Sequence, residues 1–402
     1  MIASHDGRPP RKPPSPQAKA LPSRQVTAMR RSLLRWFRKH ARPLPWRESN
    51  DFYRVWLSEI MLQQTQVETA VPYFRRFIRA FPSLQALAEA PLEQVLEYWS
   101  GLGYYRRARH LHQAAQIIVA ECGGQFPRDW ASVRALPGVG DYTARAILSI
   151  ADNQPYAVLD GNVARVMARL LALRGNIRRA HFRRTVERQA QALLSRRHPG
   201  EFNQAVMEIG QTLCRLREPR CPQCPLRRWC RARRLGQTEA FPEPAPRRPA
   251  VRRHLALAVI PQDGRVLVVK GLDEGLTPDL WNFPSAFGSS PQQALRALRR
   301  KIGSVTNARL PLSQPVAEFR HNITYRSIRA RVYLAKAEVR PPTRRASQHD
   351  AAADAGPLTA DARWLTLGQL RRAALGQMAR KAIQCLRDSP GANFAQLHLH
   401  FG

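Results

Sequence analysis

The apolar residues of this chain change their spacing once, at a proline-rich stretch that reads TEAFPEPAPRRPAVRR. From about Val26 to Arg234 they recur every three or four residues, as in YRVWLSEIMLQQTQVETAVPYFRRFIRAF and NVARVMARLLAL. That spacing is typical of amphipathic helices, and proline and glycine separate the segments. We therefore predict an all-α domain over residues 26–234, followed by a linker over residues 235–250.

Beyond this linker the apolar residues follow a period of two. SIRARVYLAKAEV alternates as a strand does, and HLALAVIPQDGRVLVVK predicts strand, turn and strand, with Asp263 and Gly264 as the hairpin signal. PQQALRALRRKIG predicts a helix that ends at Gly303. Residues 251–390 are thus expected to form an α+β domain.

The two ends of the chain lack the pattern of a packed domain. The N-terminal residues are rich in proline and arginine without periodicity, which predicts a disordered basic arm over residues 1–25. They lack the apolar core of a secretion signal, and no apolar run approaches the ~18 residues of a transmembrane helix. Residues 391–402 are expected to be a tail, and a length of 402 residues allows two to three domains.

The charge of the chain indicates a polyanionic partner. A total of 65 Lys and Arg against 29 Asp and Glu gives a formal net charge of +36, spread over the whole length. This excess suits nucleic acid, whereas a membrane surface is disfavoured because no long amphipathic basic helix stands out. The alternative is a generally basic composition without a dedicated partner.

Four of the six cysteines lie in CRLREPRCPQCPLRRWC. Four thiolates at this C-x6-C-x2-C-x5-C spacing can surround one metal centre, which indicates a reducing compartment rather than a disulfide framework. A cubane iron–sulfur cluster tolerates uneven loops, whereas structural zinc usually takes two short pairs, and both remain open on spacing alone. The candidate ligands are Cys214, Cys221, Cys224 and Cys230.

The segment LPGVG joins two predicted helices by a turn. Its glycines let the backbone approach a ligand closely, and the following helix presents unpaired N–H groups at its start. Such a hairpin can hold a nucleic-acid phosphate without reading sequence, although many glycine turns are only turns. The candidate DNA contacts here are Leu136, Gly138, Val139 and Gly140.

Two carboxylates lie in settings that suit catalysis. Glu59, in VWLSEIMLQQ, follows Val55 and Trp56 by one helical turn, and apolar neighbours raise the pKa of a carboxylate towards that of a general acid. Asp160, in VLDGNVARV, precedes an apolar helix. Each has a plainer interpretation, an exposed helical glutamate and an N-cap aspartate.

Four separated motifs together resemble one enzyme superfamily. They are LSEIMLQQTQV, GLGYYRRARHL, LPGVGDYTARAIL with VLDGNVARV, and the four-cysteine spacing. Over about residues 27–385 the chain resembles the helix-hairpin-helix DNA glycosylases that carry an iron–sulfur cluster. LQQTQV, LDGN and the additional C-terminal domain are more similar to the MutY family of adenine DNA glycosylases than to endonuclease III. The implied architecture is an all-α helix-hairpin-helix domain with a 4Fe-4S loop, followed by an α+β Nudix-like domain.

This resemblance implies a base excision repair enzyme that hydrolyses the N-glycosidic bond of adenine mispaired with 8-oxoguanine or guanine in duplex DNA. The base must leave the helical stack to be reached. Gln64 and Tyr104 would insert into the duplex at the lesion, and Trp46 and Arg47 would border the adenine pocket. The resemblance also implies a monomer that works in the cytoplasm at the bacterial nucleoid, with a 4Fe-4S cluster on the four cysteines.

The chemistry of the implied reaction assigns roles to four residues. Adenine leaves readily only once a ring nitrogen is protonated, and Glu59 would supply that proton. Asp160 would stabilise or trap the oxocarbenium-like sugar that remains, as in retaining glycosidases. Asn162 would orient Asp160 through a side-chain hydrogen bond, and Tyr142 would lie between the carboxylates and the sugar.

The helical part of the chain has no lysine between Lys39 and Lys270. Relatives that also cleave the strand form a Schiff base through a lysine of the hairpin helix, and Tyr142 occupies that position here. We therefore predict a monofunctional glycosylase. A glycosylase-lyase like endonuclease III, acting on oxidised pyrimidines, and a non-catalytic DNA-binding protein are the alternatives.

The C-terminal domain resembles a Nudix domain without its catalytic helix. Nudix hydrolases hold Mg²⁺ on a glutamate-rich helix, and no acidic residue occurs from Leu280 to Ala317. The domain is therefore expected to bind rather than to cut. In the family a Phe-Ser-His loop reads 8-oxoguanine; RHNITYR stands at this place, where Ile323 departs from the aromatic. The candidate recognition residues are His321, Thr324 and Tyr325.

Overall fold

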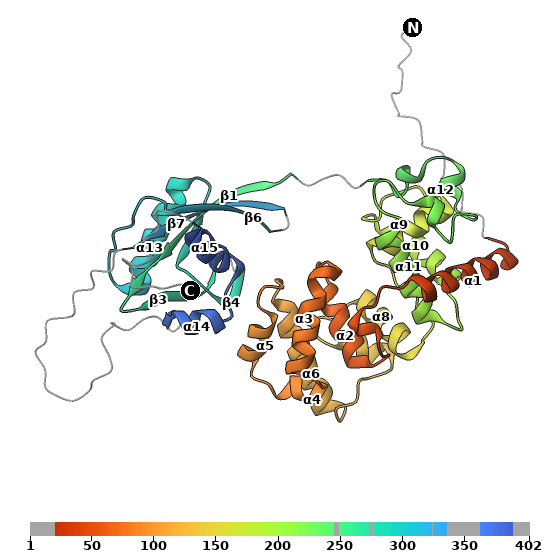
Figure 1. The fold of residues 1–402 in the computed structure, drawn as a ribbon, viewed down its shortest axis with the longest axis horizontal. Coiled ribbons are helices and arrows are strands. Elements are labelled where there is room, and N and C mark those ends of the chain that lie inside the picture. Colours follow the sequence, from red (N-terminus) through yellow and green to blue (C-terminus); the bar gives the residue numbers. More distant parts are fainter. Residues whose placement is uncertain (1–20, 245–248, 273–275, 324, 336–361, 389–402) are drawn as a thin grey trace, which may run out of the picture. The chain divides into compact units, whose positions relative to one another are not determined.

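The computed structural model of the chain describes residues 21–244, 249–272, 276–323, 325–335 and 362–388 (Figure 1). The chain forms two compact units. The first comprises Met1–Ile78, Ser83–Ala88 and Gln113–Pro246, and the second comprises Arg79–Pro82, Glu89–His112 and Arg247–Gly402. The predicted disordered arm lies outside the described residues up to residue 20, and the predicted tail lies outside them entirely.

The first half of the chain is helical, as its spacing predicts. Its α-helices are α1 Ser23–His40, α2 Phe52–Leu62, α3 Val67–Ala80, α4 Leu84–Glu89, α5 Leu92–Trp99, α6 Arg106–Glu121, α7 Trp130–Ala135, α8 Asp141–Asp152, α9 Gly161–Leu171, α10 Ala180–Leu193, α11 Pro199–Thr212 and α12 Arg231–Arg234. Three 3-10 turns, η1 Pro45–Arg47, η2 Cys221–Gln223 and η3 Thr238–Ala240, lie between them. No described helix is both long enough and apolar enough to cross a membrane.

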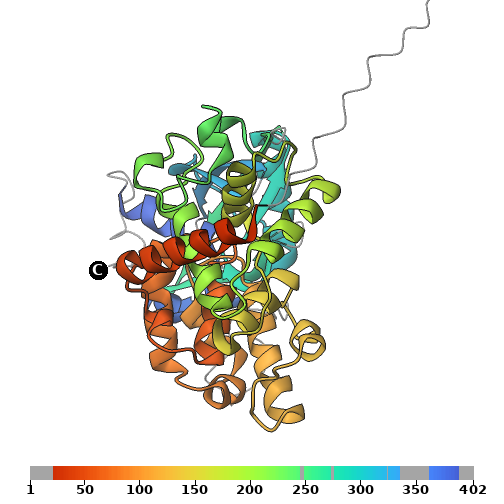
Figure 2. The same cartoon turned by 90° about the vertical axis from the view of Figure 1, so that its right-hand side faces the viewer.

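Helix α9 is the centre of the larger helical core. It is buried from Val163 to Leu171 except at Arg165, and it packs against α10, α11 and α12. Helix α8 packs against both α2 and α11, and α1 (red) lies across α11 (Figure 2). Because α8 is in contact with α2 and α11, side chains from three distant parts of the sequence meet at its first turn.

The long apolar pattern after Phe52 forms two helices rather than one. Asp51 caps α2, because its carboxylate accepts a hydrogen bond from the Arg54 amide at 2.8 Å. The helix ends at Leu62, and Gln64 in the following turn has a φ of 58°. Helix α3 then starts at Val67. The turn between α2 and α3 has a place in the site described below.

The C-terminal half contains two sheets, in agreement with the predicted α+β class. The strands are β1 Val251–Val259, β2 Pro261–Gln262, β3 Arg265–Leu272, β4 Leu276–Asn282, β5 Ser285–Gly288, β6 Ala317–Ile323, β7 Arg326–Leu334 and β8 Ala362–Thr366. One sheet has the order β5-β1-β7-β6, with β1 and β7 parallel. The other has the order β2-β3-β4, with β8 also paired to β3.

Two helices cover opposite faces of the first sheet, and α14 Leu367–Arg372 follows β8. Leu255 and Leu257 of β1 share a core with α15 Gln377–Arg387, whereas Ala256 and Ala258 face α13 Pro291–Thr306 (Figure 1). This alternation is the period of two seen in the sequence.

Two details of this half differ from the sequence prediction. Helix α13 continues through Gly303 to Thr306, and Asn307 at φ 52° takes the left-handed capping position. Asp263 and Gly264 do form a two-residue turn, at φ 48° and 70°, but it joins β3 to the short β2 rather than to β1. Strand β1 instead pairs with β5 and β7. Local turn signals do not indicate these pairings, because the strands are not joined to β1 by a short turn.

Candidate active site

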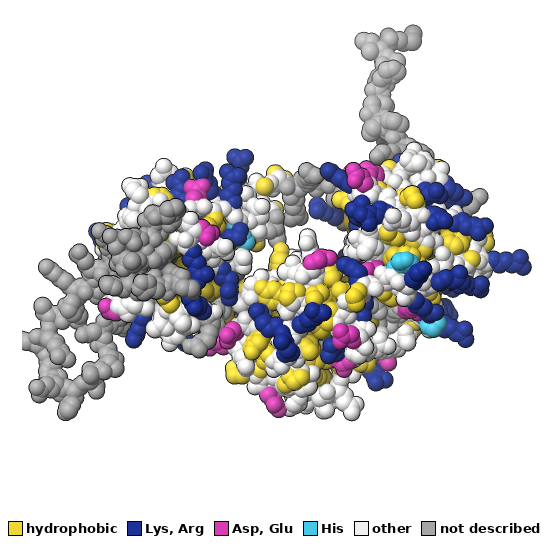
Figure 3. Space-filling view, in the orientation of Figure 1, with side chains coloured by type: hydrophobic (Ala, Val, Ile, Leu, Met, Phe, Trp, Pro, Cys, Tyr) yellow, Lys and Arg dark blue, Asp and Glu magenta, His cyan; other side chains and the backbone are white. Residues whose placement is uncertain are grey.

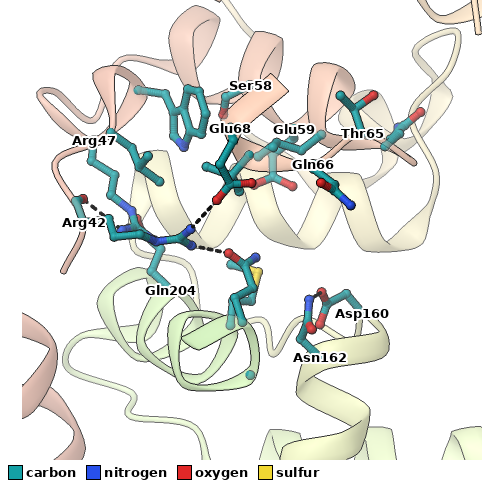
Figure 4. Close-up of a pocket in the computed structure, with 18 of the residues that line it drawn as sticks. Arg42, Arg47, Ser58, Glu59, Thr65, Gln66, Glu68, Asp160, Asn162 and Gln204 are labelled. Carbon is teal, nitrogen blue, oxygen red and sulfur yellow. Dashed lines mark hydrogen bonds and ion pairs between the residues drawn. The ribbon is translucent and has the colours of Figure 1, made fainter. Parts of the chain in front are cut away.

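One cavity of about 840 Å³ in the first unit brings together all four predicted catalytic residues (Figure 4). Its walls come from η1, α2, the α2–α3 turn, α8, the start of α9, α11 and the loop that follows α11. The predicted residues that line it are Trp46, Arg47, Glu59, Gln64, Tyr142, Asp160 and Asn162. Side chains that are a hundred residues apart in sequence therefore meet in one pocket.

Glu59 lies on α2 and is 6% exposed, among apolar neighbours that include Val55 and Trp56. Burial raises its pKa from 4.5 to about 7, and the charge of Asp160 adds to the rise. A hydrogen bond from Tyr142 opposes this shift, because it stabilises the ionised form. The plainer interpretation, an exposed helical glutamate, is wrong.

Tyr142 lies in the first turn of α8, where it is hydrogen-bonded to Glu59 and within reach of the charge of Asp160. Its hydroxyl donates a hydrogen bond to Glu59 and lies 3.5 Å from the sulfur of Met207. Burial raises the pKa of Tyr142 well above 10, and the charges of Glu59 and Asp160 raise it further. The phenol therefore stays protonated and acts as a donor at any physiological pH.

Asp160 both caps α9 and faces the pocket. Its Oδ1 accepts a hydrogen bond from the Val163 amide at 2.7 Å, as an N-cap does. Its Oδ2 accepts one from Nδ2 of Asn162 at 2.8 Å, which is the bond expected from the sequence (Figure 4). The two interpretations of this aspartate are compatible, since one oxygen serves the helix and the other is held at the cavity.

A further hydrogen-bonded residue ties this pair to the cysteine loop. Arg165 donates to Oδ1 of Asn162 at 2.9 Å, to the Gly210 carbonyl at 2.7 Å and to the Cys214 carbonyl at 2.7 Å. An unbroken chain of hydrogen bonds thus leads from Asp160 through Asn162 and Arg165 to the backbone of the first cysteine.

A buried ion-pair network, which the sequence analysis did not predict, reaches the cavity through Arg42 and Arg47. Glu208 of α11 has a side chain only 1% exposed, and its two oxygens lie 2.6 Å from Nε of Arg42 and 2.9 Å from Nη2 of Arg47. Burial raises the pKa of Glu208, but hydrogen bonds from both arginines outweigh it and lower the net value. Gln204 and Gln211 accept further bonds from these arginines.

A signal for this network was present in the sequence. Glu208 interrupts the apolar residues of FNQAVMEIGQ, and a carboxylate in a buried helix needs a cation. Its partners lie more than 160 residues away, so the sequence does not identify them.

The hairpin between α7 and α8 presents its backbone and hides its apolar side chains. Leu136 and Val139 are buried, and the Val139 amide is bonded to the Leu136 carbonyl at 3.1 Å. Gly138 has a φ of 77°, a conformation that favours glycine. No residue in the described part of the chain accepts a hydrogen bond from the amides of Gly138 or Gly140. These two amides, rather than that of Val139, are available to a ligand.

The two predicted intercalating residues share an unusual backbone. Gln64 is exposed at φ 58°, and Tyr104 is 46% exposed at φ 49°. Positive φ is uncommon for such residues and is typical of functional positions. Gln64 lines the cavity; Tyr104 belongs to the second unit, where the guanidinium of Arg107 lies 5.5 Å from the centre of its ring.

The four predicted ligand cysteines line a second cavity of only about 30 Å³. In the described part of the chain, no three His, Cys, Asp or Glu side chains come close enough together to ligate a single metal ion. Four thiols around one small void, with the guanidinium of Arg169 at 3.4 Å from Cys214 Sγ, are a donor set that fits a thiolate-bound metal centre.

Two of the predicted recognition residues of the second unit are described: His321 lies on β6, and Tyr325 directly precedes β7. His321 lies on β6 and is half-buried; burial lowers its pKa, and the charge of Lys381 lowers it further. Tyr325 is 43% exposed. Thr324 lies outside the described residues. Helix α13 carries no carboxylate, so it lacks the Mg²⁺ ligands of a Nudix hydrolase.

Basic side chains outnumber acidic ones on the surface of the described chain that Figure 3 shows. Figure 3 shows many Lys and Arg side chains on the visible faces of both units and few Asp and Glu among them. This distribution agrees with the net charge of +36 and with a polyanionic partner.

Comparison with known proteins agrees with this geometry. Residues 57–192 match the HhH-GPD superfamily of base excision DNA repair proteins, and residues 255–385 match the NUDIX domain. The adenine DNA glycosylase of Rattus norvegicus is 35% identical over 90% of this chain and 78% of its own length. That of Homo sapiens is 33% identical over 91% of this chain and 76% of its own length.

A bacterial relative adds to these two. The adenine DNA glycosylase of Buchnera aphidicola is 34% identical over 67% of this chain and 77% of its own length. The resemblance inferred from the four sequence motifs is thereby confirmed. Since these identities extend over most of each sequence, and since the pocket joins two carboxylates beside a helical hairpin, the chain belongs to the adenine DNA glycosylase family.

Proposed function

We propose that this adenine DNA glycosylase removes adenine mispaired with 8-oxoguanine or guanine in duplex DNA, and that Glu59 and Asp160 carry out the reaction. The observation that supports this assignment is the contrast between the two carboxylates of one cavity. Glu59 is buried with its pKa raised to about 7, whereas Asp160 accepts two hydrogen bonds. In such a pair, Glu59 can serve as the proton donor and Asp160 as the anion.

In the first step, Glu59 donates its proton to a ring nitrogen of the extruded adenine. A pKa of about 7 keeps a large fraction of the carboxyl protonated at neutral pH while leaving it acidic enough to give the proton up. The bond between C1′ and N9 then breaks, and its electron pair leaves with the adenine. Tyr142 holds the carboxyl in place through its hydrogen bond.

In the second step, Asp160 meets the positive charge on the sugar. Its Oδ2 is held by Asn162 and can either stabilise the oxocarbenium ion or bond to C1′. Water then adds at C1′ and gives its proton to the Glu59 carboxylate, which restores the enzyme. The products are free adenine and an abasic sugar in an intact strand.

The wall formed by Trp46 and Arg47 is proposed to bind the base. Trp46 is buried and packs edge-on against Phe74, with ring centres 5.3 Å apart. Arg47 is fixed by Glu208, Gln204 and the Arg42 carbonyl. A rigid aromatic wall beside fixed polar groups suits a planar base with hydrogen-bonding edges.

Duplex DNA is proposed to dock on the hairpin and the basic surface around it. The amides of Gly138 and Gly140 can bind a backbone phosphate, and Gln64 can enter the helix where the adenine leaves it. Tyr104 is proposed to insert as well. All the residues named for catalysis come from one chain, so a monomer acting on chromosomal DNA is sufficient.

The four cysteines are proposed to hold a 4Fe-4S cluster. Bound there, the cluster would act as a structural cross-link of the loop between Cys214 and Cys230. The loop is rigid in its own right at its start, because Arg165 bonds to the Cys214 carbonyl and Arg169 to the next carbonyl, that of Arg215. Visible absorbance and iron content of the purified protein distinguish this cluster from zinc.

The enzyme is proposed to be monofunctional. The cavity wall carries arginines but no lysine, and a guanidinium stays protonated and does not attack an aldehyde. Strand cleavage should therefore require added alkali. A covalent adduct trapped by borohydride in amounts matching adenine release would contradict this proposal.

The second unit is proposed to recognise 8-oxoguanine through the turn between β6 and β7. Tyr325 offers an exposed ring and His321 a polar edge, while Ile323 replaces the aromatic residue of the family pattern. Thr324 completes the proposed set. Comparison of excision opposite 8-oxoguanine and opposite guanine in Tyr325→Ala measures this contribution.

Single-turnover excision tests the catalytic assignment. The substrates are duplexes with adenine opposite 8-oxoguanine or guanine, and one with thymine glycol to detect an endonuclease III-like activity. We expect Glu59→Gln and Asp160→Asn to abolish adenine release while DNA binding persists. Glu68→Gln is a matched control, because Glu68 lines the same cavity but has a side chain 76% exposed.

Asp129→Asn is the control for the aspartate. Asp129 caps α7 through the Ser132 amide at 2.9 Å, as Asp160 caps α9, but it does not line the cavity. Asparagine caps helices as well as aspartate does, so both variants should fold. A near-normal rate in Glu59→Gln or in Asp160→Asn would refute the assignment.

A further inference from the structure

Leu216 is exposed to solvent at the edge of the catalytic cavity. Its relative exposure is 69%, the highest among the large hydrophobic residues that the described chain exposes. It lines the cavity together with its neighbour Arg215, on the loop that follows α11. An exposed leucine is ordinary on a protein surface. One at the edge of the catalytic cavity, however, lies where the DNA strand must approach.

The loop presents this side chain from a fixed backbone. Arg169 is 2% exposed, and it donates hydrogen bonds to the carbonyls of Arg215 at 2.6 Å and of Leu216 at 2.9 Å. Its Nε is bonded to the Phe241 carbonyl at 3.0 Å. A buried guanidinium thus holds the backbone beneath Leu216, and charge-assisted bonds of this kind are among the stronger ones in proteins.

Leu216 and Gln64 lie on different rims of the same cavity. Gln64 belongs to the turn between α2 and α3, whereas Leu216 belongs to the loop after α11, and both are exposed residues that line the cavity. An adenosine that enters the cavity has a DNA backbone passing over both rims. Each rim must therefore contact the strand on one side of the extruded nucleotide.

The chemistry around Leu216 matches a sugar between two phosphates. Arg215 and Arg217 flank it directly, and Arg220 follows on the same loop. Arginines bind phosphate oxygens, while the deoxyribose between two phosphates offers an apolar edge. Proteins that deform DNA use leucine and similar apolar side chains as wedges between base steps in the minor groove, so an exposed leucine is a usual contact of distorted DNA.

We propose that Leu216 packs against the deoxyribose next to the extruded adenosine and thereby holds the opened strand at the second rim of the cavity. This inference rests on the glycosylase activity and adds a DNA contact to it. The contact forms only after the nucleotide has left the stack, because only then does the backbone pass over the cavity. Leu216 is therefore expected to favour a lesion duplex over a fully paired one.

Leu216→Ala tests the proposal, with Leu235→Ala as the matched control. Leu235 is 58% exposed and directly follows Arg233 and Arg234, but it does not line the cavity. Binding is measured by fluorescence anisotropy on a duplex with an abasic analogue opposite 8-oxoguanine and on the fully paired duplex. Extrusion is followed through 2-aminopurine placed beside the target adenine.

We expect Leu216→Ala to weaken binding of the lesion duplex about 10-fold, which corresponds to 1.4 kcal/mol, and to reduce the 2-aminopurine signal. Binding of the paired duplex, and both affinities of Leu235→Ala, should remain as in the parent protein. Leu216→Met, which keeps an apolar side chain of similar volume, should restore the affinity.

Three results would overturn the proposal. Equal affinities of Leu216→Ala and Leu235→Ala for the lesion duplex would show that Leu216 makes no such contact. Equal losses on lesion and paired duplexes would make Leu216 a general DNA contact. A lower melting temperature of Leu216→Ala by circular dichroism, or a change of its oligomeric state, would assign the side chain to folding or to a protein partner.

Discussion

The hydrogen bond from Tyr142 to Glu59 lowers the pH at which the general acid loses its proton. Burial raises the pKa of Glu59 to about 7, and this bond acts against the rise by stabilising the carboxylate. In Tyr142→Phe the ring still fills its place beside Met207, but the donor is gone. The pKa of Glu59 should therefore rise further.

The size of this shift follows from the strength of the bond. A hydrogen bond to a charged group contributes about 1.5 kcal/mol or more, and one pKa unit corresponds to about 1.36 kcal/mol. Loss of the bond should thus raise the pKa of Glu59 by about one unit. The protonated form is the active one, so excision should be constant at low pH and fall tenfold per pH unit above this pKa.

Single-turnover excision measured from pH 5.5 to 9.5 at constant ionic strength reveals the midpoint of that fall. It should lie near pH 7 in the parent protein and about one unit higher in Tyr142→Phe. Met207→Leu is the control, since it removes the other contact of the hydroxyl, at 3.5 Å, and should leave the midpoint in place. An unchanged or lower midpoint in Tyr142→Phe would refute the reasoning.

Three further predictions follow from the buried groups. The folded protein keeps the Glu59 proton up to about pH 7 and the unfolded chain only to about 4.5, so ionisation of Glu59 opposes folding increasingly across this range. The free energy of unfolding of Glu59→Gln, measured with denaturant, should therefore exceed that of the parent by up to about 3 kcal/mol at pH 8 and equal it at pH 4. The same difference at both pH values would contradict this. Glu208→Ala leaves Arg42 and Arg47 without their carboxylate and should cost about 3 kcal/mol in urea unfolding at pH 7, whereas a loss below about 1 kcal/mol would show that the network contributes little. Arg165→Leu should slow excision more than it weakens DNA binding, as measured by single-turnover rates and anisotropy, and equal losses would mean that Arg165 contacts DNA instead.

Much of the site could be predicted from sequence because its key residues carry local signals. Glu59 lies one turn beyond Val55 and Trp56, so its burial follows from helical geometry. Asp160 and Asn162 are two residues apart, and their hydrogen bond joins neighbours at the start of α9. The fold class of the helical half and of the mixed half also follows from local patterns, since each depends on the period of its hydrophobic residues.

What the sequence did not indicate depends on tertiary packing. Glu208 meets Arg42 and Arg47 only because α11 packs near η1, and no local pattern specifies that meeting. The positive φ values of Gln64 and Tyr104 are set by turns whose residues are not typical of such conformations. Likewise, Glu89–His112 groups with the C-terminal unit although its spacing is as helical as that of its neighbours.

The hydrogen bonds of Arg165 make the catalytic carboxylate and the start of the cysteine loop depend on one side chain. Arg165 bonds at one end to the Cys214 carbonyl and at the other to Asn162, which holds Asp160. A substitution that moves the Cys214 carbonyl should therefore also shift Asp160. Damage to this loop would then reach the reacting sugar without altering any residue of the catalytic pair.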